Sequence, residues 1–181
     1  MTIEETYIHG CVVITPNVYE DNRGYFFESF NQKKFNDLTG LKINFVQDNQ
    51  SKSEKGVLRG LHFQIGESAQ AKLVRVIKGR VLDVCVDLRP NSKTFKKHFA
   101  IELSENNKKQ LFIPRGFAHG FVVLENNTIF SYKCDNYYDK SSERGIRFDD
   151  RELNIDWRLP KESIILSEKD QALPTLKEYL Q

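Results

Sequence analysis

The chain has 181 residues, and its 27 basic and 25 acidic side chains give a formal net charge of +2. This length suits one domain over residues 1–181, and no basic block points to nucleic acid as a partner. No apolar run is long enough for a membrane span or for the core of a signal peptide, so we expect a cytoplasmic protein. Cys11, Cys85 and Cys134 are widely spaced and odd in number, which indicates reduced thiols and no disulfide framework.

Short segments rich in β-branched and aromatic residues follow one another along most of the chain. Turn signals such as DNRG, RPNS and ENN separate them. Many short strands at close spacing predict a mainly β sandwich or barrel of the jelly-roll kind. The predicted strands cover residues 10–16, 24–30, 43–49, 57–64, 71–79, 80–88, 96–104, 109–114, 119–125 and 128–134.

Only a few helical segments are expected. Residues 31–40 are polar and end at Gly40, which predicts one short helix that stops at this glycine. The tail from about Ser167 onward is predicted to combine loop with short helix.

Alternation sorts the faces of two strands without saying which face points inward. In residues 80–88, Asp83 shares one face with Val81 and Cys85. In residues 71–79, Lys72 shares a face with Val74. If these faces line a ligand cavity, Asp83 and Lys72 are candidates for its polar groups.

The strand VLRGLHFQ, residues 57–64, places Arg59 and His62 among apolar neighbours. Burying such groups is costly without a partner, so Arg59 needs an anion and His62 needs a hydrogen bond or a chemical role. A histidine here suits a general base near neutral pH, and it equally suits a core residue bonded to a backbone carbonyl. Strict alternation puts the two side chains on opposite faces, although Gly60 permits a bulge that re-aims the strand.

Histidines in a jelly roll are also the ligands of metal-dependent cupins. Such a site uses an HxH pair, a glutamate and a later histidine. Here Gln64 occupies the second position of the pair that His62 would begin, and His119 in PRGFAH stands in a stretch that resembles the second cupin motif. Two histidines without the adjacent pair and the acid make a poor metal site, so we expect no bound metal.

Six longer runs of sequence carry a family resemblance. They are DNRGYFFESF, QDNQSKSEKGVLRGLHFQ, QAKLVRVIKGRVLDVCVDLRPNSKTF, IPRGFAHGF, YKCDNYYDKSSERGI and LSEKD, and the similarity extends from about residue 9 to residue 170. In this order they resemble the dTDP-4-dehydrorhamnose 3,5-epimerase family. The resemblance implies a cupin-like double-stranded jelly-roll barrel that works as a homodimer without metal or other cofactor. It also implies an isomerase that inverts C3 and C5 of dTDP-4-dehydro-6-deoxy-D-glucose through an enolate, giving dTDP-4-dehydro-L-rhamnose.

The resemblance further implies roles for the polar residues singled out above. His62 would take the proton next to the C4 ketone, and the Asp170 carboxylate would orient it. Lys72 would stabilise the developing enolate charge, and Tyr132 would return a proton from the opposite face. His119 would line the sugar pocket.

The nucleotide part of the substrate has matching positions as well. Two arginines resemble the diphosphate ligands of the family, since a guanidinium pairs with phosphate in a bidentate way. In some members the N-terminal region of the partner subunit completes the pocket. The implied positions are Arg23 and Arg59 for the diphosphate, Glu28, Gln47 and Asn49 for thymine and deoxyribose, Phe26 and Tyr138 for stacking, and Glu143 and Lys169 as further ligands.

The chain also departs from the family pattern, but outside the acid–base set. The departing positions are Lys96, Lys140, Phe148 and Arg158.

Three other functions stay open at this point: a single-carbon epimerase for a related nucleotide sugar, a metal-dependent cupin enzyme, and a sugar-nucleotide-binding module without turnover. His62 and Tyr132 together favour double epimerisation, because the proton for the second face needs an acid.

Overall fold

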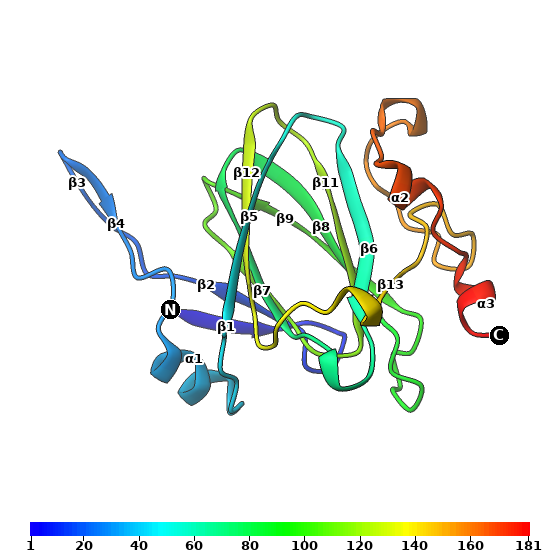
Figure 1. Cartoon of the computed structure of the whole chain (residues 1–181). Coiled ribbons are helices and arrows are strands. Elements are labelled where there is room, and N and C mark those ends of the chain that lie inside the picture. Colours follow the sequence, from blue (N-terminus) through cyan, green and yellow to red (C-terminus); the bar gives the residue numbers. More distant parts are fainter.

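The computed structural model describes residues 1–181 and consists mainly of strands, with a few short helices (Figure 1). The strands are β1 (Thr2–Glu5), β2 (Val12–Thr15), β3 (Tyr19–Asp21), β4 (Gly24–Phe26), β5 (Gln47–Ser53), β6 (Leu58–Gln64), β7 (Lys72–Lys78), β8 (Arg80–Asp87), β9 (His98–Ser104), β10 (Gln110–Ile113), β11 (Phe117–Val123), β12 (Thr128–Cys134) and β13 (Glu143–Gly145). The α-helices are α1 (Gln32–Thr39), α2 (Glu168–Gln171) and α3 (Leu176–Tyr179). None of these helices has the length and apolar character needed to cross a membrane.

Two large antiparallel sheets form the body of the molecule. One has the strand order β1-β2-β10-β7-β12-β5, and the other has the order β13-β6-β11-β8-β9. Neighbours in both sheets are mostly distant in sequence, as the crossed connections of a jelly roll require. The β3–β4 hairpin is a separate small sheet that projects away from this body in Figure 1. The mainly β, cupin-like jelly-roll fold expected from the sequence is confirmed.

Most predicted strands occur close to their expected positions, and two differ. The strand predicted at 24–30 ends at Phe26, and the strand predicted at 43–49 is instead β5, over residues 47–53. β5 is polar and alternates between exposed and partly buried residues, so it lacks the apolar run that marks a strand. The helix predicted at 31–40 is α1, which Asn31 caps and Gly40 ends with a φ of 69°.

Apolar side chains from both sheets meet inside the barrel. They include Val74 of β7, Val81 and Cys85 of β8, and Phe130 of β12. Asp83 lies between Val81 and Cys85 on the same face of β8, so its carboxylate points into the barrel with them. The three cysteines are all buried and carry free thiols.

Apolar residues also cover the outer faces of both sheets. The C-terminal tail runs along the five-stranded sheet in Figure 1, and α1 packs on the six-stranded sheet. The tail contributes Phe148, Trp157 and Leu176, and α1 contributes Phe35. Because both faces of β8 are therefore apolar, alternation alone does not distinguish its inner face from its outer face.

A bulge in β6 decides whether Arg59 and His62 of the VLRGLHFQ strand face opposite sides or the same side of the sheet. His62 pairs with His119 on β11, whereas Arg59 pairs with Phe121, so β6 has one more residue than β11 between these two pairs. The extra residue lets Arg59 and His62 face the same side of the sheet. Gly60 makes the bulge with a φ of +120°, and its backbone lies directly against Gly120.

Gly60→Ala is expected to be strongly destabilising. A methyl group at Gly60 would lie 2.5 Å from the Cα of Gly120 and 2.7 Å from the carbonyl oxygen of His119. The unfavourable φ costs about 1–3 kcal/mol, and forcing the two strands apart adds about 1–3 kcal/mol. Gly24→Ala is the matched control, because Gly24 has a φ of +123° and nothing within 4 Å of an added methyl group. Urea unfolding of both variants should show a clearly larger loss of unfolding free energy for Gly60→Ala. Equal losses in the two variants would contradict the close contact with β11.

Candidate active site

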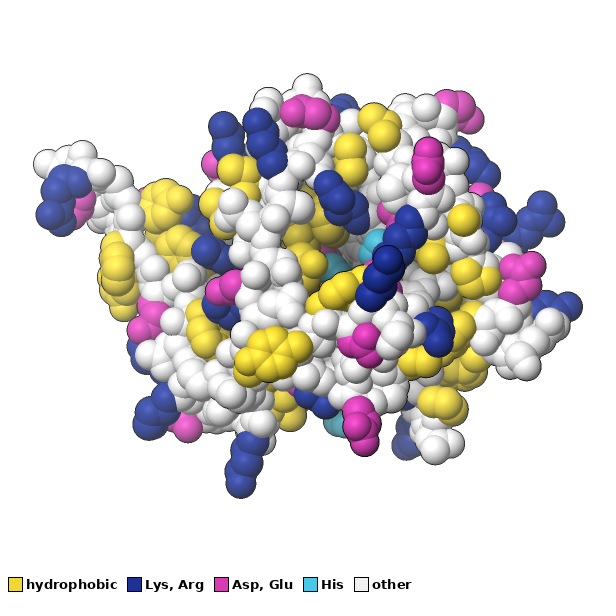
Figure 2. Space-filling view, in the orientation of Figure 1, with side chains coloured by type: hydrophobic (Ala, Val, Ile, Leu, Met, Phe, Trp, Pro, Cys, Tyr) yellow, Lys and Arg dark blue, Asp and Glu magenta, His cyan; other side chains and the backbone are white.

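A cavity of about 380 Å³ lies between the two sheets and is bordered by the C-terminal tail. Its walls include Arg59, His62, Lys72, His119 and Tyr132, which come from strands of both sheets. Figure 2 shows a hollow on this face of the molecule, with histidine side chains inside it and lysine and arginine side chains at its edge. The cavity is thus a polar pocket in a barrel that is otherwise filled with apolar side chains.

A second cavity of about 220 Å³ adjoins the first. The two share Asn49, His62, Lys72 and Tyr132 as common lining residues. The smaller cavity is otherwise lined mainly by neutral polar and aromatic groups, among them Gln47 and Tyr138. The two cavities form adjoining lobes, with His62, Lys72 and Tyr132 at the place where they meet.

His62 is bonded to a carboxylate from the tail. Its Nε2 lies 2.5 Å from Oδ1 of Asp170, and the Asp170 side chain is 5% exposed against 27% for His62. Burial by itself raises the pKa of Asp170, but the hydrogen bond and charge of His62, with the Ser167 hydroxyl, outweigh it and lower that pKa. An ionised carboxylate only accepts hydrogen bonds, so the proton of the neutral imidazole is on Nε2 and Nδ1 is unprotonated.

His119 forms a second histidine–aspartate pair, deeper in the barrel. Its Nε2 lies 3.0 Å from Oδ2 of Asp83, which is fully buried on β8. Burial lowers the pKa of His119 and prevails over the opposing effect of the Asp83 charge. The ring is therefore neutral at pH 7, with its proton on Nε2 toward Asp83, and Nδ1 can accept a hydrogen bond. No three His, Cys, Asp or Glu side chains converge on one point in the structure.

Lys72 and Tyr132 lie side by side on β7 and β12. The ammonium of Lys72 is 5.8 Å from the centroid of the Tyr132 ring. Burial lowers the pKa of Lys72, while the charges of Asp83 and Glu143 and the Cys134 thiol oppose this shift. Burial also raises the pKa of Tyr132, so its hydroxyl keeps its proton and can donate it.

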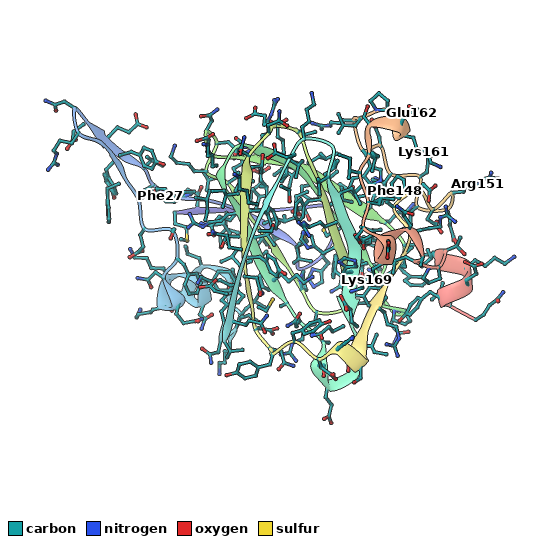
Figure 3. All side chains as sticks on the ribbon, turned by 45° about the horizontal axis from the view of Figure 1, so that its top comes forward. Phe27, Phe148, Arg151, Lys161, Glu162 and Lys169 are labelled. Atoms are coloured by element: carbon teal, nitrogen blue, oxygen red, sulfur yellow. The ribbon has the colours of Figure 1, made fainter.

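The remaining pocket residues form a hydrogen-bonded rim. Lys169 on α2, labelled in Figure 3, makes an ion pair with Glu143 at 2.6 Å, and the Tyr138 hydroxyl donates to the same carboxylate at 2.8 Å. The backbone N–H of Tyr138 donates to the side chain of Gln47, which in turn donates to Asn49. These contacts join the tail, the segment after β12 and strand β5 around the smaller lobe.

Arg59 stands at the edge of the larger lobe without an acidic partner. Its guanidinium donates to the Ser53 hydroxyl at 3.1 Å, and no carboxylate lies within ion-pair distance. A cation that reaches into a cavity and lacks an anion is suited to bind an anionic ligand.

Three residues expected at the pocket lie elsewhere in this chain. Arg23 is 89% exposed at its side chain and pairs with Asp21, and Phe26 is 70% exposed on the β3–β4 hairpin. Glu28 makes an ion pair with Lys34 on α1. In Figure 3, Phe27 beside the hairpin and Lys169 at the pocket lie on opposite sides of the barrel. A single chain therefore does not bring the hairpin residues to the cavity.

Sequence reasoning left two residues of the site without a role. Asp83 is predicted only as a candidate polar group of the cavity, and the fold reveals that it pairs with His119. Ser167 is predicted only as the start of the tail, whereas its hydroxyl donates a hydrogen bond to Asp170 at 2.9 Å. The sequence contains a signal for it, since a serine three residues before an aspartate is a typical helix N-cap arrangement. The positions that depart from the family pattern, Lys96, Lys140, Phe148 and Arg158, line neither cavity.

Comparison with known proteins places the chain in one family. A family model described as dTDP-4-dehydrorhamnose 3,5-epimerase matches residues 5–178. The enzyme of that name from Escherichia coli is 51% identical over 181 residues, covering 99% of this chain and 97% of the relative.

Solved structures agree with this match. A dTDP-4-dehydrorhamnose 3,5-epimerase from Elizabethkingia anophelis superposes with a TM-score of 0.95 at 57% identity, covering 98% of this chain and 97% of that one. A dTDP-6-deoxy-D-glucose-3,5-epimerase from Legionella pneumophila, solved in complex with dTDP-4-keto-L-rhamnose, superposes with a TM-score of 0.93 at 47% identity, covering 97% and 93%. With matches of this extent in both sequence and structure, the chain belongs to the dTDP-4-dehydrorhamnose 3,5-epimerase family.

Proposed function

We propose that this chain is an isomerase that inverts C3 and C5 of dTDP-4-dehydro-6-deoxy-D-glucose and yields dTDP-4-dehydro-L-rhamnose. The observation that carries the proposal is the His62–Asp170 pair, which shares one cavity with Lys72 and Tyr132. A ketone at C4 acidifies the C–H bonds on both neighbouring carbons. A base, an acid and a positive charge near the ketone oxygen then suffice for inversion, and the scheme needs no cofactor.

His62 is the base in this scheme. Its unprotonated Nδ1 takes the proton from carbon, and the electron pair of the broken C–H bond moves onto the C4 oxygen as an enolate. The Asp170 carboxylate at Nε2 stabilises the imidazolium that forms and holds the ring in the required tautomer. Lys72 stabilises the enolate oxygen, because an ammonium in a partly dehydrated site acts on a nearby charge more strongly than it does in water.

Tyr132 is the acid that makes the exchange an inversion. Its protonated hydroxyl delivers a proton to the face of the carbon opposite His62, and the enolate electrons return to form the new C–H bond. His119 accepts a hydrogen bond from a sugar hydroxyl through Nδ1. Arg59 binds the diphosphate, Gln47 and Asn49 contact thymine and deoxyribose, Tyr138 stacks on the base, and Glu143 and Lys169 are further ligands.

The exposed hairpin supports a homodimeric enzyme. Arg23, Phe26 and Glu28 lie away from the cavity of their own chain, and the aromatic side chains of the hairpin are exposed. We propose that residues 1–181 form one catalytic domain, that two copies associate in the cytoplasm, and that each hairpin completes the cavity of its partner. Arg23 then joins Arg59 at the diphosphate.

Solvent exchange tests the proposed reaction directly. When dTDP-4-dehydro-6-deoxy-D-glucose is incubated with the protein in D₂O containing EDTA, proton NMR should show deuterium at both C3 and C5 of the product. Each inverted carbon receives its new hydrogen from solvent, which is the physical reason for the label. Label at one carbon only would restrict the enzyme to single-carbon epimerisation. Exchange that occurs only after metal is added would instead identify a metal-dependent cupin enzyme.

Two variants separate the base from the acid. His62→Asn should lower the rate of both exchange and inversion by about 10²–10⁴-fold while dTDP still binds. Tyr132→Phe should still exchange the proton on the His62 side. Deuterium then enters the substrate with its configuration retained, and inversion is lost. Tyr137→Phe, a change at the exposed neighbour of Tyr138, is the control and should behave as the wild type. Full inversion by Tyr132→Phe would remove Tyr132 from its role as the acid.

Mixing two inactive variants tests the contribution of the hairpin. Arg23→Ala and His62→Asn should each be poor enzymes alone, because the first lacks a diphosphate ligand and the second lacks the base. If Arg23 serves the partner's site, a refolded equimolar mixture contains mixed dimers with one intact site, and about a quarter of the wild-type activity should return. If Arg23 serves its own chain, no site in the mixture is intact and activity stays at the level of the separate variants.

A further inference from the structure

The carboxylate that faces His62 is held at both of its oxygens. Oδ1 of Asp170 contacts Nε2 of His62 at 2.5 Å, and Oδ2 accepts a hydrogen bond from the Ser167 hydroxyl at 2.9 Å. The backbone N–H of Asp170 donates to the same serine oxygen at 3.1 Å. Ser167 therefore contacts Asp170 twice, through its backbone and through the carboxylate oxygen that His62 does not use.

Ser167 also stands at the junction between an anchored segment and a short helix. Ile165, two residues earlier, is tied to the start of β6, because its N–H donates to Gly56 and its carbonyl accepts from Leu58. Immediately after Ser167 begins α2, which has only four residues and carries Asp170. A helix of this length has little stability of its own, so its orientation depends on contacts at its ends.

A second side-chain contact of α2, an ion pair, is weaker in kind. Lys169 pairs with Glu143 across the rim, but its side chain is 54% exposed, and exposed ion pairs between flexible side chains constrain geometry little. The Ser167 hydroxyl, by contrast, donates its hydrogen bond to the Asp170 carboxylate itself. Rotation of the Asp170 side chain away from His62 would break the bond to Ser167 at the same time.

We propose that Ser167 is a positioning residue, whose hydroxyl fixes the Asp170 carboxylate so that Oδ1 faces His62 and the imidazole keeps its proton on Nε2. The catalytic meaning of this inference rests on the proposed function, since Nδ1 is available as the base only in that tautomer. Loss of the hydroxyl leaves Asp170 free to rotate and lets the imidazole proton occupy either ring nitrogen.

Three variants distinguish positioning from simple helix capping. Ser167→Ala removes both contacts, whereas Ser167→Thr keeps a hydroxyl at the same place and an accepted N-cap residue. Thr175→Ala is the matched control, because Thr175 caps the four-residue helix α3 with a capping box and has no contact with Asp170 or His62. Asp170→Asn provides the reference spectrum for a His62 ring that has lost its carboxylate.

Two measurements are made on each variant. Steady-state assays should show kcat reduced about tenfold or more in Ser167→Ala, with KM little changed and with recovery in Ser167→Thr. Long-range ¹H–¹⁵N NMR of the His62 ring in the ligand-free protein should show the Nε2–H tautomer in the wild type, in Ser167→Thr and in Thr175→Ala. Ser167→Ala should show a mixture of the two tautomers.

The inference fails if Ser167→Ala keeps the wild-type tautomer and the wild-type kcat, which would leave Ser167 as a helix cap only. It also fails if Thr175→Ala reproduces the loss of kcat, since any weakened helix cap would then suffice. If the wild-type protein shows no epimerase activity, the proposed function is wrong, but the NMR measurement still tests the link between Ser167 and the His62 ring.

Discussion

The contact between His62 and Asp170 joins the barrel to the C-terminal tail, and the candidate site depends on it. The two residues are 108 positions apart in sequence, so the chain must fold completely before they meet. Apolar packing of the tail on the five-stranded sheet, through Trp157 and Leu176, brings the carboxylate there. The outer face of the five-stranded sheet therefore positions the His62–Asp170 pair.

Burial sets the protonation states of the other groups in the cavity. The same loss of water lowers the pKa of Lys72 and of His119 and raises the pKa of Tyr132. In water these side chains would titrate close to their ordinary values. Between the two sheets, His119 becomes a neutral acceptor and Tyr132 remains a protonated donor. The barrel thus supplies an acid, an acceptor and a poorly hydrated cation through one physical effect, without a separate device for each.

Sequence patterns predicted the fold wherever strands carried apolar runs. They were less informative at β1, β3 and β13, which have three or four residues each and are largely polar, and at β5, whose exposed face makes it read as a loop. The assignment of Lys72 to the same face as Val74 is confirmed by the structure, because strand alternation is a local property. The alternation argument for Arg59 and His62 needed the bulge at Gly60, whose geometry depends on the contact with Gly120 on another strand.

The sequence by itself determined the β-rich character of the chain, the alternation within each strand and the family to which the chain belongs. These properties depend on residue types and local spacing, which the amino-acid sequence contains directly. Only the tertiary structure decided which face of β8 points inward, since both faces are apolar, and that Asp83 is the partner of His119. It also decided that the β3–β4 hairpin lies away from the cavity of its own chain. These features arise from contacts between segments far apart in sequence, and such contacts exist only once both sheets and the tail have packed together.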